Sequence, residues 1–492
     1  MRTIRTDVLV IGSGFGGAAP ALRLAQAGFR VHMIEKGESI GTADFRQTQD
    51  PRYLKRFIRG LSGDHVSFTY AEALGGGSGF YEMVSLRAPS QAFSARDEEG
   101  GVLWPTSLDR VAFDPWYEMA ERMLKVEQIA PNEVPKSGLV FSLLMKNLGL
   151  SCDRARYAVK GCLGSGFCIT GCVYGAKQSL HLNYLPQALE AGAVIDCNLS
   201  AIRIEARQGR PWRYRVYCRA TVGNREWRRY EARIVILAGG TVGTAALLLA
   251  SRSTLATMSP ALGDHICVNG GVKVAALLPE GIPDGDMFAG RSHPGMISYH
   301  FLESHGITIS AVKALPIQAI TAARFRLDGD PREPAWWGEA NVDFMRQFRH
   351  RVIALTSFGL TPPGARLTLL PGGPAVSMAP TPAMEAYEST TRALLESILV
   401  RNGCRLVHTD WLDRSGRPHE DLYFSTAHQT GSARMADDPE RGVVNADGEV
   451  FGNPGLYVTD GAAIPSSLAV NTSLTILANA ERISAGIVRR KT

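Results

Sequence analysis

Cysteine is scarce in this sequence, and long apolar runs are absent from it. Eight cysteines among 492 residues are too few to hold a chain of this size together by disulfides, so the fold must depend on a hydrophobic core. One long stretch without charge, Ile234 to Ala250, approaches the length of a membrane span, but glycines and threonines interrupt its centre. We therefore expect a strand, a turn and a buried helix there, and no transmembrane segment.

The start of the chain also lacks the pattern of a secretory signal. Met1 to Asp7 carries two arginines but leads directly into a strand-like run, with no apolar signal core and no small-residue cleavage site. The sequence therefore predicts a cytoplasmic protein. Export to the periplasm together with a partner subunit stays open.

Neither sign of charge dominates. Lys and Arg number 53 against 47 Asp and Glu, and the basic residues are scattered along the chain, which disfavours nucleic-acid binding. With 45% hydrophobic and 20% charged residues, the composition is that of a globular protein, and the length predicts about two to four domains.

Glycine is abundant, at 51 residues. This predicts several turns in which a side chain would obstruct the backbone or a ligand.

A βαβ unit is predicted at the N-terminus. A strand-like run at Asp7 to Ile11, a helix-like stretch at Ala18 to Ala27 and a second strand at Phe29 to Ile34 follow one another. The turn between the first strand and the helix fits GxGxxG and consists of Gly12, Ser13, Gly14, Phe15, Gly16 and Gly17. This arrangement of strand, glycine turn and helix is typical of a dinucleotide site.

Each part of this turn has a physical role in such a site. Gly12 would permit the tight turn, Gly14 the approach of a pyrophosphate and Gly17 the close packing of the helix, whose N-terminus would face the phosphates. Glu35, which ends the second strand, would accept hydrogen bonds from an adenosine ribose and disfavours a 2′-phosphate. At this point both FAD and NAD remain candidates.

The rest of the chain alternates strand-like and helix-like segments. Further glycine turns lie at Gly75 to Gly79 and at Gly239 to Gly240. The predicted strands are Val194 to Ile204, Arg213 to Thr221, Arg233 to Ala238, Ile307 to Ala311, Val352 to Thr356 and Arg366 to Leu370, and the predicted helices are Leu182 to Ala191 and Pro382 to Val400. Mixed strands with one covering helix after residue 268 suggest an antiparallel substrate domain.

The C-terminal part of the chain carries the most specific motifs. Asn453 to Ile464 (NPGLYVTDGAAI) and Pro465 to Glu481 (PSSLAVNTSLTILANAE) follow His428 in AHQTGSARM. Together with the N-terminal unit and the turn ALGGGSGF, these segments resemble the glucose-methanol-choline (GMC) family of FAD oxidoreductases across essentially the whole chain. The resemblance selects FAD over NAD.

The resemblance implies an α/β fold of two interleaved domains. A Rossmann-like FAD-binding domain would comprise residues 1–88, 155–265 and 420–492. A discontinuous, largely antiparallel β substrate-binding domain would comprise residues 89–154 and 266–419. The residues that match the family's FAD contacts are Gly12, Ser13, Gly14, Phe15, Gly16, Gly17, Glu35, Lys36, Gly76, Gly77, Ser78, Gly239, Asp460 and Thr472.

The same resemblance assigns roles near the flavin. Asp460 would lie near the flavin phosphates or ribityl chain, and the helix after Asn471 would point its N-terminus at the isoalloxazine ring, where its dipole would stabilise an anionic reduced flavin. Tyr81 and Glu82 stand where the family lines the flavin with a polar residue, although the asparagine common there is missing.

His428 and Asn471 match the family's catalytic pair. Oxidation of an alcohol needs a neutral imidazole that takes the hydroxyl proton while the hydride passes to flavin N5, and a second polar group that holds the same oxygen. The resemblance therefore predicts His428 as the base and Asn471 as its partner. Four aromatic residues could wall a hydrophobic substrate pocket: Phe325, Trp336, Trp337 and Phe358.

Three cysteines crowd one glycine-rich stretch. Cys162, Cys168 and Cys172 in GCLGSGFCITGCVYGAK resemble the segment of bacterial FAD-dependent glucose dehydrogenase catalytic subunits that is implied to bind a [3Fe-4S] cluster, and thiolates suit such a cluster. There are other possibilities for these cysteines. They could be buried thiols, form a disulfide or bind zinc, although the CxxC spacing usual for zinc is absent. They could also belong to the similar short segment that cholesterol-oxidase-like members of the family keep here.

The predicted protein is therefore a flavoprotein dehydrogenase that oxidises a CH–OH donor, a sugar or another alcohol, and passes electrons through the cluster to an external acceptor. A small accessory subunit or a cytochrome could be that acceptor. The rivals are an oxygen-using oxidase of sterols or other bulky alcohols without a cluster, and a redox-neutral relative that only binds flavin.

Overall fold

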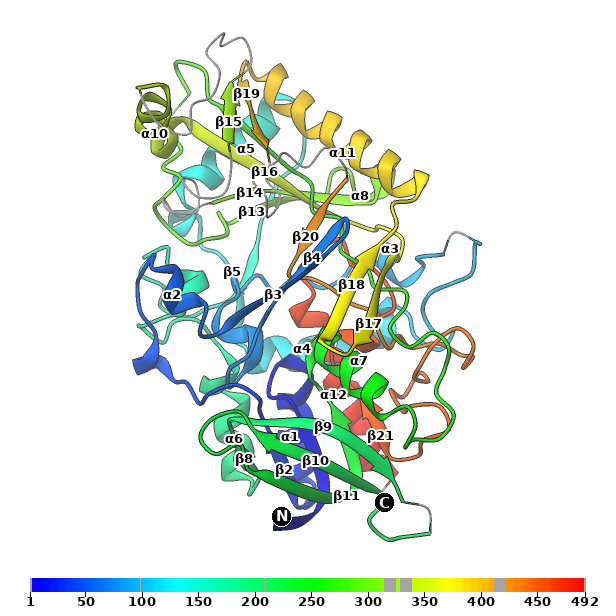
Figure 1. The fold of residues 1–492 in the computed structure, drawn as a ribbon. Coiled ribbons are helices and arrows are strands. Elements are labelled where there is room, and N and C mark those ends of the chain that lie inside the picture. Colours follow the sequence, from blue (N-terminus) through cyan, green and yellow to red (C-terminus); the bar gives the residue numbers. More distant parts are fainter. Residues whose placement is uncertain are drawn as a thin grey trace.

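The chain folds around two large sheets, one in the lower and one in the upper half of Figure 1. The structure is a computed structural model that describes residues 2–490 except 98, 208, 283, 314–323, 328–338 and 411–421. Of the four aromatic residues predicted to wall a substrate pocket, Phe325, Trp336 and Trp337 lie outside the described side chains, and Phe358 lies within them.

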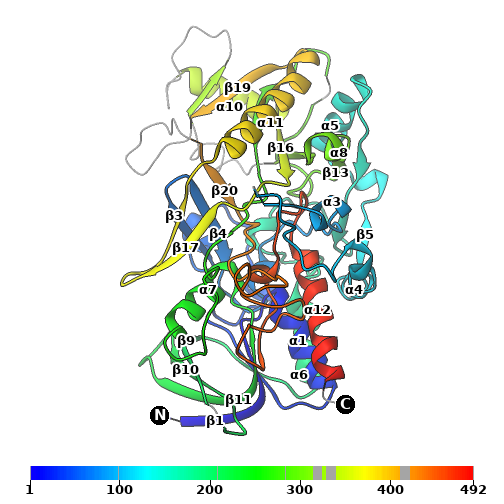
Figure 2. The same ribbon diagram turned by 90° about the vertical axis from the view of Figure 1, so that its right-hand side faces the viewer.

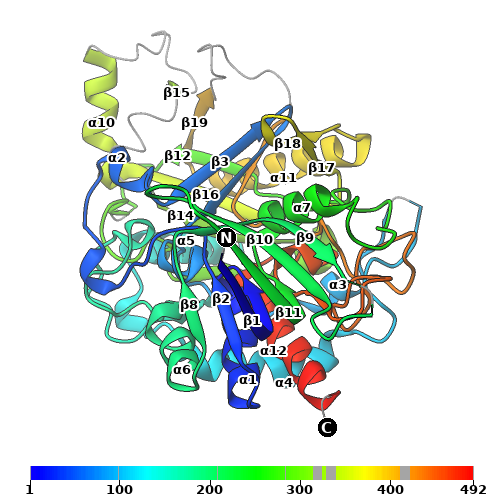
Figure 3. The ribbon, with the colours of Figure 1, turned by 60° about the horizontal axis from the view of Figure 1, so that its bottom comes forward.

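The first sheet contains the predicted βαβ unit. Its order is β8-β2-β1-β11-β10-β9, and β21 pairs with the end of β11; Figure 3 shows β1 between β2 and β11. The strands are β1 (Arg2–Ile11), β2 (Val31–Ile34), β8 (Val194–Asp196), β9 (Leu199–Ala206), β10 (Tyr214–Ala220), β11 (Trp227–Leu237) and β21 (Leu456–Val458). All pairs are parallel except β9 with β10 and β10 with β11.

Helices cover both faces of this sheet, as the apolar run in β1 requires. They are α1 (Phe15–Gln26), α6 (Tyr184–Glu190), α7 (Gly240–Ser251) and α12 (Ser473–Arg489), and α4 (Arg110–Met123) packs on α12. Helix α1 packs against α6 and α12, and α7 packs against β9; Figure 2 shows α1 and α12 side by side. Because β1, β11 and β21 run parallel, their carboxyl ends meet at one edge of the sheet. Ligands bind at this edge in sheets of this kind.

The second sheet is antiparallel in every described pair. Its order is β15-β19-β12-β16-β14-β13-β6. The strands are β6 (Asp153–Arg154), β12 (Lys273–Leu277), β13 (Met296–Ser298), β14 (Ile307–Val312), β15 (Arg324–Leu327), β16 (Val352–Gly359) and β19 (Arg405–Asp410). Helices α5 (Lys136–Asn147) and α11 (Pro382–Arg401) pack on it, and α8 (Leu302–His305) and α10 (Glu339–Arg351) lie beside it (Figure 1).

Smaller elements lie between the two large sheets (Figure 1). A three-stranded sheet joins β3 (Ile58–Gly63), β4 (Val66–Ala71) and β20 (Phe424–Thr426), so it connects N-terminal and C-terminal parts of the chain. The remaining elements are α2 (Pro51–Leu54), α3 (Ser90–Phe93), the pair β5 (Val126–Gln128) with β7 (Arg156–Ala158), and the hairpin β17 (Ala365–Leu370) with β18 (Gly373–Met378).

The predicted fold class is confirmed: a Rossmann-like α/β layer is combined with an antiparallel β domain built from separated segments. The predicted strand at Val194 to Ile204 is wrong as a single element. It divides into β8 and β9 because Asn198 adopts a left-handed φ of 57°.

No helix within the described part of the chain is long and apolar enough to cross a membrane. The stretch Ile234 to Ala250 forms the end of β11, a turn and most of α7. The exact domain boundaries stay a prediction.

Candidate active site

The first glycine turn is packed so closely that side chains are excluded at several positions. Gly12 has a φ of 104°, and a Cβ on it would lie 2.2 Å from the carbonyl oxygen of Ala238 at the end of β11. A Cβ on Gly17 would lie 1.9 Å from the oxygen of Gly12, and one on Gly16 would lie 2.6 Å from Asp460. Close packing thus explains two of the three GxGxxG glycines, Gly12 and Gly17, and also the additional Gly16.

The N-terminus of α1 leaves hydrogen-bond donors free. The backbone N–H groups of Phe15 and Gly16 have no acceptor among the described residues, as expected for the first turn of a helix. Such donors, with the helix dipole behind them, favour an anionic group. The turn therefore fits the pyrophosphate of a dinucleotide.

Ser13 links this turn to two other segments. It donates from its backbone and from its hydroxyl to Glu35, over 3.0 and 2.6 Å, and its hydroxyl accepts from the N–H of Gly75 over 2.9 Å. Glu35 also accepts from Gly37 and is only 6% exposed, and this burial raises the pKa of its carboxyl. Glu35 therefore already organises the turn, and its contact with a ribose stays a prediction.

The remaining predicted cofactor residues differ in their surroundings. Lys36 is exposed and forms an ion pair with Glu72. Ser78 is buried, and its hydroxyl bonds to the backbone of Gly75 and Leu180.

The second glycine turn lies directly against the first. A Cβ on Gly76 would come within 2.9 Å of Gly14, whereas one on Gly77 would meet no atom within 4 Å. Gly77 and Gly239 are both exposed. The backbone at these two glycines therefore stands open beside the first turn.

Asp460 joins the third glycine turn to the C-terminal segment. Its carboxylate accepts from the N–H of Gly240 over 2.7 Å and from the hydroxyl of Thr244 over 2.5 Å, and its other oxygen accepts from Ala462 over 2.9 Å. The side chain is 3% exposed, and this desolvation raises its pKa to about 6. Asp460 thus holds the third glycine turn and the start of α7 against the C-terminal segment, and a direct contact with FAD stays a prediction.

His428 and Asn471 come together although 43 positions separate them. The Nδ2 of Asn471 lies 3.2 Å from Nε2 of His428, and Thr426 at the end of β20 accepts the backbone N–H of His428. Thr472, the buried N-cap of α12, directly follows Asn471. The predicted pair therefore sits where the start of α12 meets the end of β20.

Asn269 is a third member of this site that sequence reasoning missed. Its Oδ1 accepts from the N–H groups of Leu468 and Ala469, both over 2.9 Å, and its Nδ2 donates to the oxygen of Val470 over 2.9 Å and lies 3.3 Å from Nδ1 of His428. It is 1% exposed. In the sequence, Asn269 before two glycines indicates only a turn, and nothing in the spacing links it to residue 428.

Asn269 determines which ring nitrogen of His428 carries the proton. Because its Oδ1 is bound by two backbone donors, its Nδ2 must be the atom that faces Nδ1, which therefore accepts. A neutral His428 then carries its proton on Nε2. Asn471 Oδ1 has no partner among the described residues, and a flip of this amide would place Oδ1 opposite the Nε2 proton.

The surroundings keep His428 neutral. Burial, with a smaller contribution from the positive charge of Lys273, lowers the pKa of His428 to about 4. Phe358 of β16 packs on the imidazole with ring centroids 5.0 Å apart. A neutral imidazole with one proton on Nε2 can hold the oxygen of an alcohol, and the base role stays a prediction.

Tyr81 adds a polar group beside the first turn. Its ring packs edge-on against Phe15, with centroids 5.3 Å apart. Its hydroxyl is buried without a hydrogen-bond partner in the described part of the chain. Such an unpaired group fits a site that a cofactor completes.

The three clustered cysteines are not arranged as a metal site. Within the described residues, no group of three or more Cys, His, Asp or Glu side chains could hold a metal ion. Gly171, which lies between Cys168 and Cys172 in the sequence, is close against the ring of Phe45. Cys162, Cys168 and Cys172 form no disulfide. The structure therefore does not support the prediction of a [3Fe-4S] cluster held by these residues.

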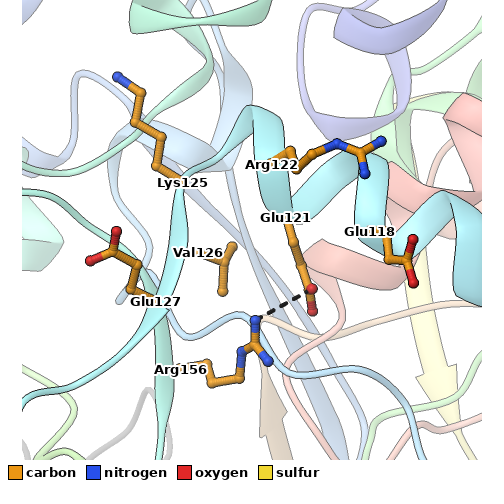
Figure 4. A pocket seen from close by; sticks show the side chains of 7 residues that line it. All are labelled: Glu118, Glu121, Arg122, Lys125, Val126, Glu127 and Arg156. Atoms are coloured by element: carbon orange, nitrogen blue, oxygen red, sulfur yellow. Dashed lines mark hydrogen bonds and ion pairs between the residues drawn. The ribbon is translucent and has the colours of Figure 1, made fainter.

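An open surface pocket lies elsewhere, beside α4 and β5 (Figure 4). Its lining is almost entirely charged, and Arg156 forms an ion pair with Glu121 across 3.4 Å. The lining residues are Glu118, Glu121, Arg122, Lys125, Val126, Glu127 and Arg156. None of the predicted cofactor or catalytic residues is among them, so this pocket is separate from the candidate active site.

Comparison with known proteins agrees with this geometry. Two family models, both described as GMC oxidoreductase, match residues 7–267 and 383–480. A cholesterol oxidase of Mycobacterium tuberculosis is 29% identical, over 97% of this chain and 90% of its own length. A long-chain-alcohol oxidase of Arabidopsis thaliana is 25% identical, over 99% of this chain and 67% of its own length.

A solved structure shares the fold. Pyridoxine 4-oxidase from Mesorbium loti superposes with a TM-score of 0.69 at 15% identity, covering 98% of this chain and 99% of that one. Because the N-terminal family model alone covers more than half of the 492 residues, the chain belongs to the GMC oxidoreductases, a family of FAD-dependent enzymes that act on CH–OH donors.

Proposed function

We propose that this enzyme oxidises a small-molecule alcohol and that dioxygen is its electron acceptor. The observation that carries the proposal is the assembly of His428, Asn471 and Asn269 at the start of α12, beside the glycine turns. When bound, FAD supplies the acceptor for the hydride that leaves the carbinol carbon.

The glycine turns are the proposed holders of FAD. The free N–H groups at the start of α1 would bind its pyrophosphate, and the exposed backbone at Gly77 and Gly239 would lie along it. The hydroxyl of Tyr81 would gain the partner it lacks. At the start of α12, the N–H groups of Ser473 and Leu474 have no acceptor among the described residues, which suits negative charge on a reduced flavin.

His428 and Asn471 are the proposed substrate-binding pair. The Nε2 proton of His428 and the amide of Asn471 would hold the alcohol oxygen, and Asn269 would fix the ring. Removal of the hydroxyl proton at Nε2 would require the other tautomer, whose Nδ1 proton would face the Asn269 amide. Asn269 therefore favours His428 as a hydrogen-bond donor to the alcohol oxygen in the resting enzyme.

Two observations favour dioxygen over an iron–sulfur route. The relatives named above are oxidases of cholesterol and of long-chain alcohols, and the described cysteines form no metal-binding group. The second candidate, a dehydrogenase with an external acceptor, rests on the spacing of Cys162, Cys168 and Cys172 alone. We therefore assign no step to a cluster.

Anaerobic titration with a panel of alcohols tests the proposal. We expect one flavin per chain, bleaching by at least one alcohol, and, in air, one hydrogen peroxide formed per dioxygen consumed. About three iron atoms per chain, with electron transfer to dyes but not to dioxygen, would instead establish the dehydrogenase. A bound flavin that no alcohol bleaches would indicate a redox-neutral relative.

Replacement of Asn269 by aspartate should change the pH dependence of this reaction. If His428 takes the hydroxyl proton, its protonation in the wild type should reduce the rate of anaerobic flavin reduction only as the pH falls through about 4. A carboxylate beside Nδ1 would stabilise the imidazolium, so in Asn269→Asp the acid limb should move up by roughly one to three pH units. Stopped-flow reduction from pH 4 to 9 measures the shift, and thermal unfolding checks that the variant is folded. An unmoved limb in a folded variant would show that Asn269 does not control His428.

A further inference from the structure

Lys273, the first residue of β12, is a cation without a hydrogen-bond or ion-pair partner among the described residues. No hydrogen bond or ion pair of its ammonium involves another described residue. The side chain is exposed, yet desolvation lowers the pKa of its ammonium. The ammonium is therefore accessible from solvent although protein atoms lie around it.

Strand register places Lys273 on the face of the second sheet that covers the active site. Lys273 pairs with Thr356, two positions from Phe358 on β16, and paired residues and those two apart point to the same face. Phe358 packs on His428. On the next strand, Thr308 pairs with Phe358 and donates its hydroxyl to the oxygen of Ala469, over 2.5 Å. This face therefore contacts the segment that carries Asn471.

Ser310, Thr356 and Lys273 form one polar row across three strands of that face. Ser310 of β14 pairs with Thr356 of β16, which pairs with Lys273 of β12. The hydroxyl of Ser310 is fully buried and has no hydrogen-bond partner among the described residues. This row lies about 7 Å from the row of Thr308 and Phe358. The Ser310 hydroxyl and the Lys273 ammonium therefore lie on the same sheet face as Phe358, the residue that packs on His428.

The other charges near Lys273 do not neutralise it. Glu82 is the one carboxyl that acts on Lys273 among the described residues, and burial raises its pKa, which weakens its charge. The positive charges of two further lysines, Lys177 and Lys313, also act on the carboxyl of Glu82. Lys177 donates to the backbone oxygens of Gly79, Tyr81 and Cys168, and Lys313 donates to that of Gly290. These two ammonium groups are held by the backbone, whereas Lys273 is available to a ligand.

We propose that Lys273 and Ser310 bind a carboxylate of the substrate, so that the preferred substrate is an alcohol that also carries an acid group. The ammonium would pair with the carboxylate and the Ser310 hydroxyl would donate to it, while His428 and Asn471 hold the hydroxyl group to be oxidised. A neutral alcohol would leave a desolvated cation unpaired, which is costly. This inference rests on the proposed function and adds a substrate class to it.

Matched pairs of acid and amide test the inference. The FAD-loaded enzyme is assayed with 4-(hydroxymethyl)benzoate against 4-(hydroxymethyl)benzamide, and with ω-hydroxy acids of several chain lengths against their amides. We expect kcat/KM for at least one acid to exceed that for its amide about tenfold or more. The preference should disappear in Lys273→Met, decrease in Ser310→Ala and persist in Lys146→Met, which removes an exposed lysine of α5. The inference is wrong if no acid reacts or binds better than its amide.

Binding without turnover separates this inference from the proposed function. The dissociation constants of 4-methylbenzoate and 4-methylbenzamide are measured from the change in the flavin spectrum. Tighter binding of the acid, lost in Lys273→Met, would support the inference even if no alcohol bleached the flavin. Neutral alcohols that bleach it, with equal binding of acid and amide, would contradict the inference alone. Lys273→Met could instead change the flavin reduction potential and leave the preference for the acid over its amide unchanged. That result would show that the lysine acts on the cofactor and would overturn the proposal.

Discussion

Replacement of His428 by alanine should lower the rate constant of anaerobic flavin reduction by about 10²- to 10⁴-fold, the usual contribution of a positioned imidazole. The variant removes the one ring that lies between Asn471 and Asn269, while FAD binding, which we assign to the glycine turns, should be retained. Stopped-flow spectroscopy with a saturating alcohol measures the loss. A variant that reduces its flavin within fivefold of the wild-type rate would contradict the assignment.

A matched His428→Gln variant separates the two roles open to this histidine. Glutamine can place an N–H donor near the position of Nε2 but cannot take a proton. If His428 mainly holds the alcohol oxygen, as the contact with Asn269 favours, glutamine should recover a large part of the rate that alanine loses. If His428 is the general base, as the sequence predicts, both variants should be equally slow.

Replacement of Gly17 by alanine should cost about 3 kcal/mol or more of the free energy of unfolding and abolish FAD binding. The new Cβ would lie 1.9 Å from the backbone oxygen of Gly12, and neither atom belongs to a flexible side chain that could move aside. Helix α1 would have to shift away from the turn, because the added methyl group overpacks this contact. Flavin content after purification and thermal unfolding are the measurements.

Gly486→Ala is the matched control within another helix. Its Cβ would meet only the end of the Arg489 side chain, at 3.9 Å, in α12. Alanine is the better helix former by about 0.5–1 kcal/mol, so this variant should keep its flavin and melt at or above the wild-type temperature. A Gly17→Ala protein that behaves like this control would show that the turn can relax, contrary to the argument from close packing.

Local sequence signals predicted the N-terminal unit well. The apolar run ending at Ile11, the GxGxxG turn and the strand ending at Ile34 are contiguous, so short-range patterns suffice to define β1, α1 and β2. The strand predicted at Val194 to Ile204 failed because apolar periodicity does not reveal a left-handed residue such as Asn198.

Spacing of the cysteines was a weaker guide. Cys162, Cys168 and Cys172 are close in sequence, but the backbone between them is shaped by contacts with distant residues. Gly171 packs against Phe45, and the Cys168 carbonyl accepts from Lys177. Proximity along a loop therefore did not assemble a metal-binding group in the part of the chain that the structure describes.

The sequence by itself predicted the family and the fold class, because these depend on motifs that each occupy one short segment, and the family resemblance implied the pairing of His428 with Asn471. Only the tertiary structure decided that Asn269 holds the His428 ring and that Lys273 shares a face with Phe358. Both facts depend on strand register and on the meeting of segments more than 80 residues apart, which no local pattern encodes. The chemistry of the proposed substrate follows from that second set of contacts.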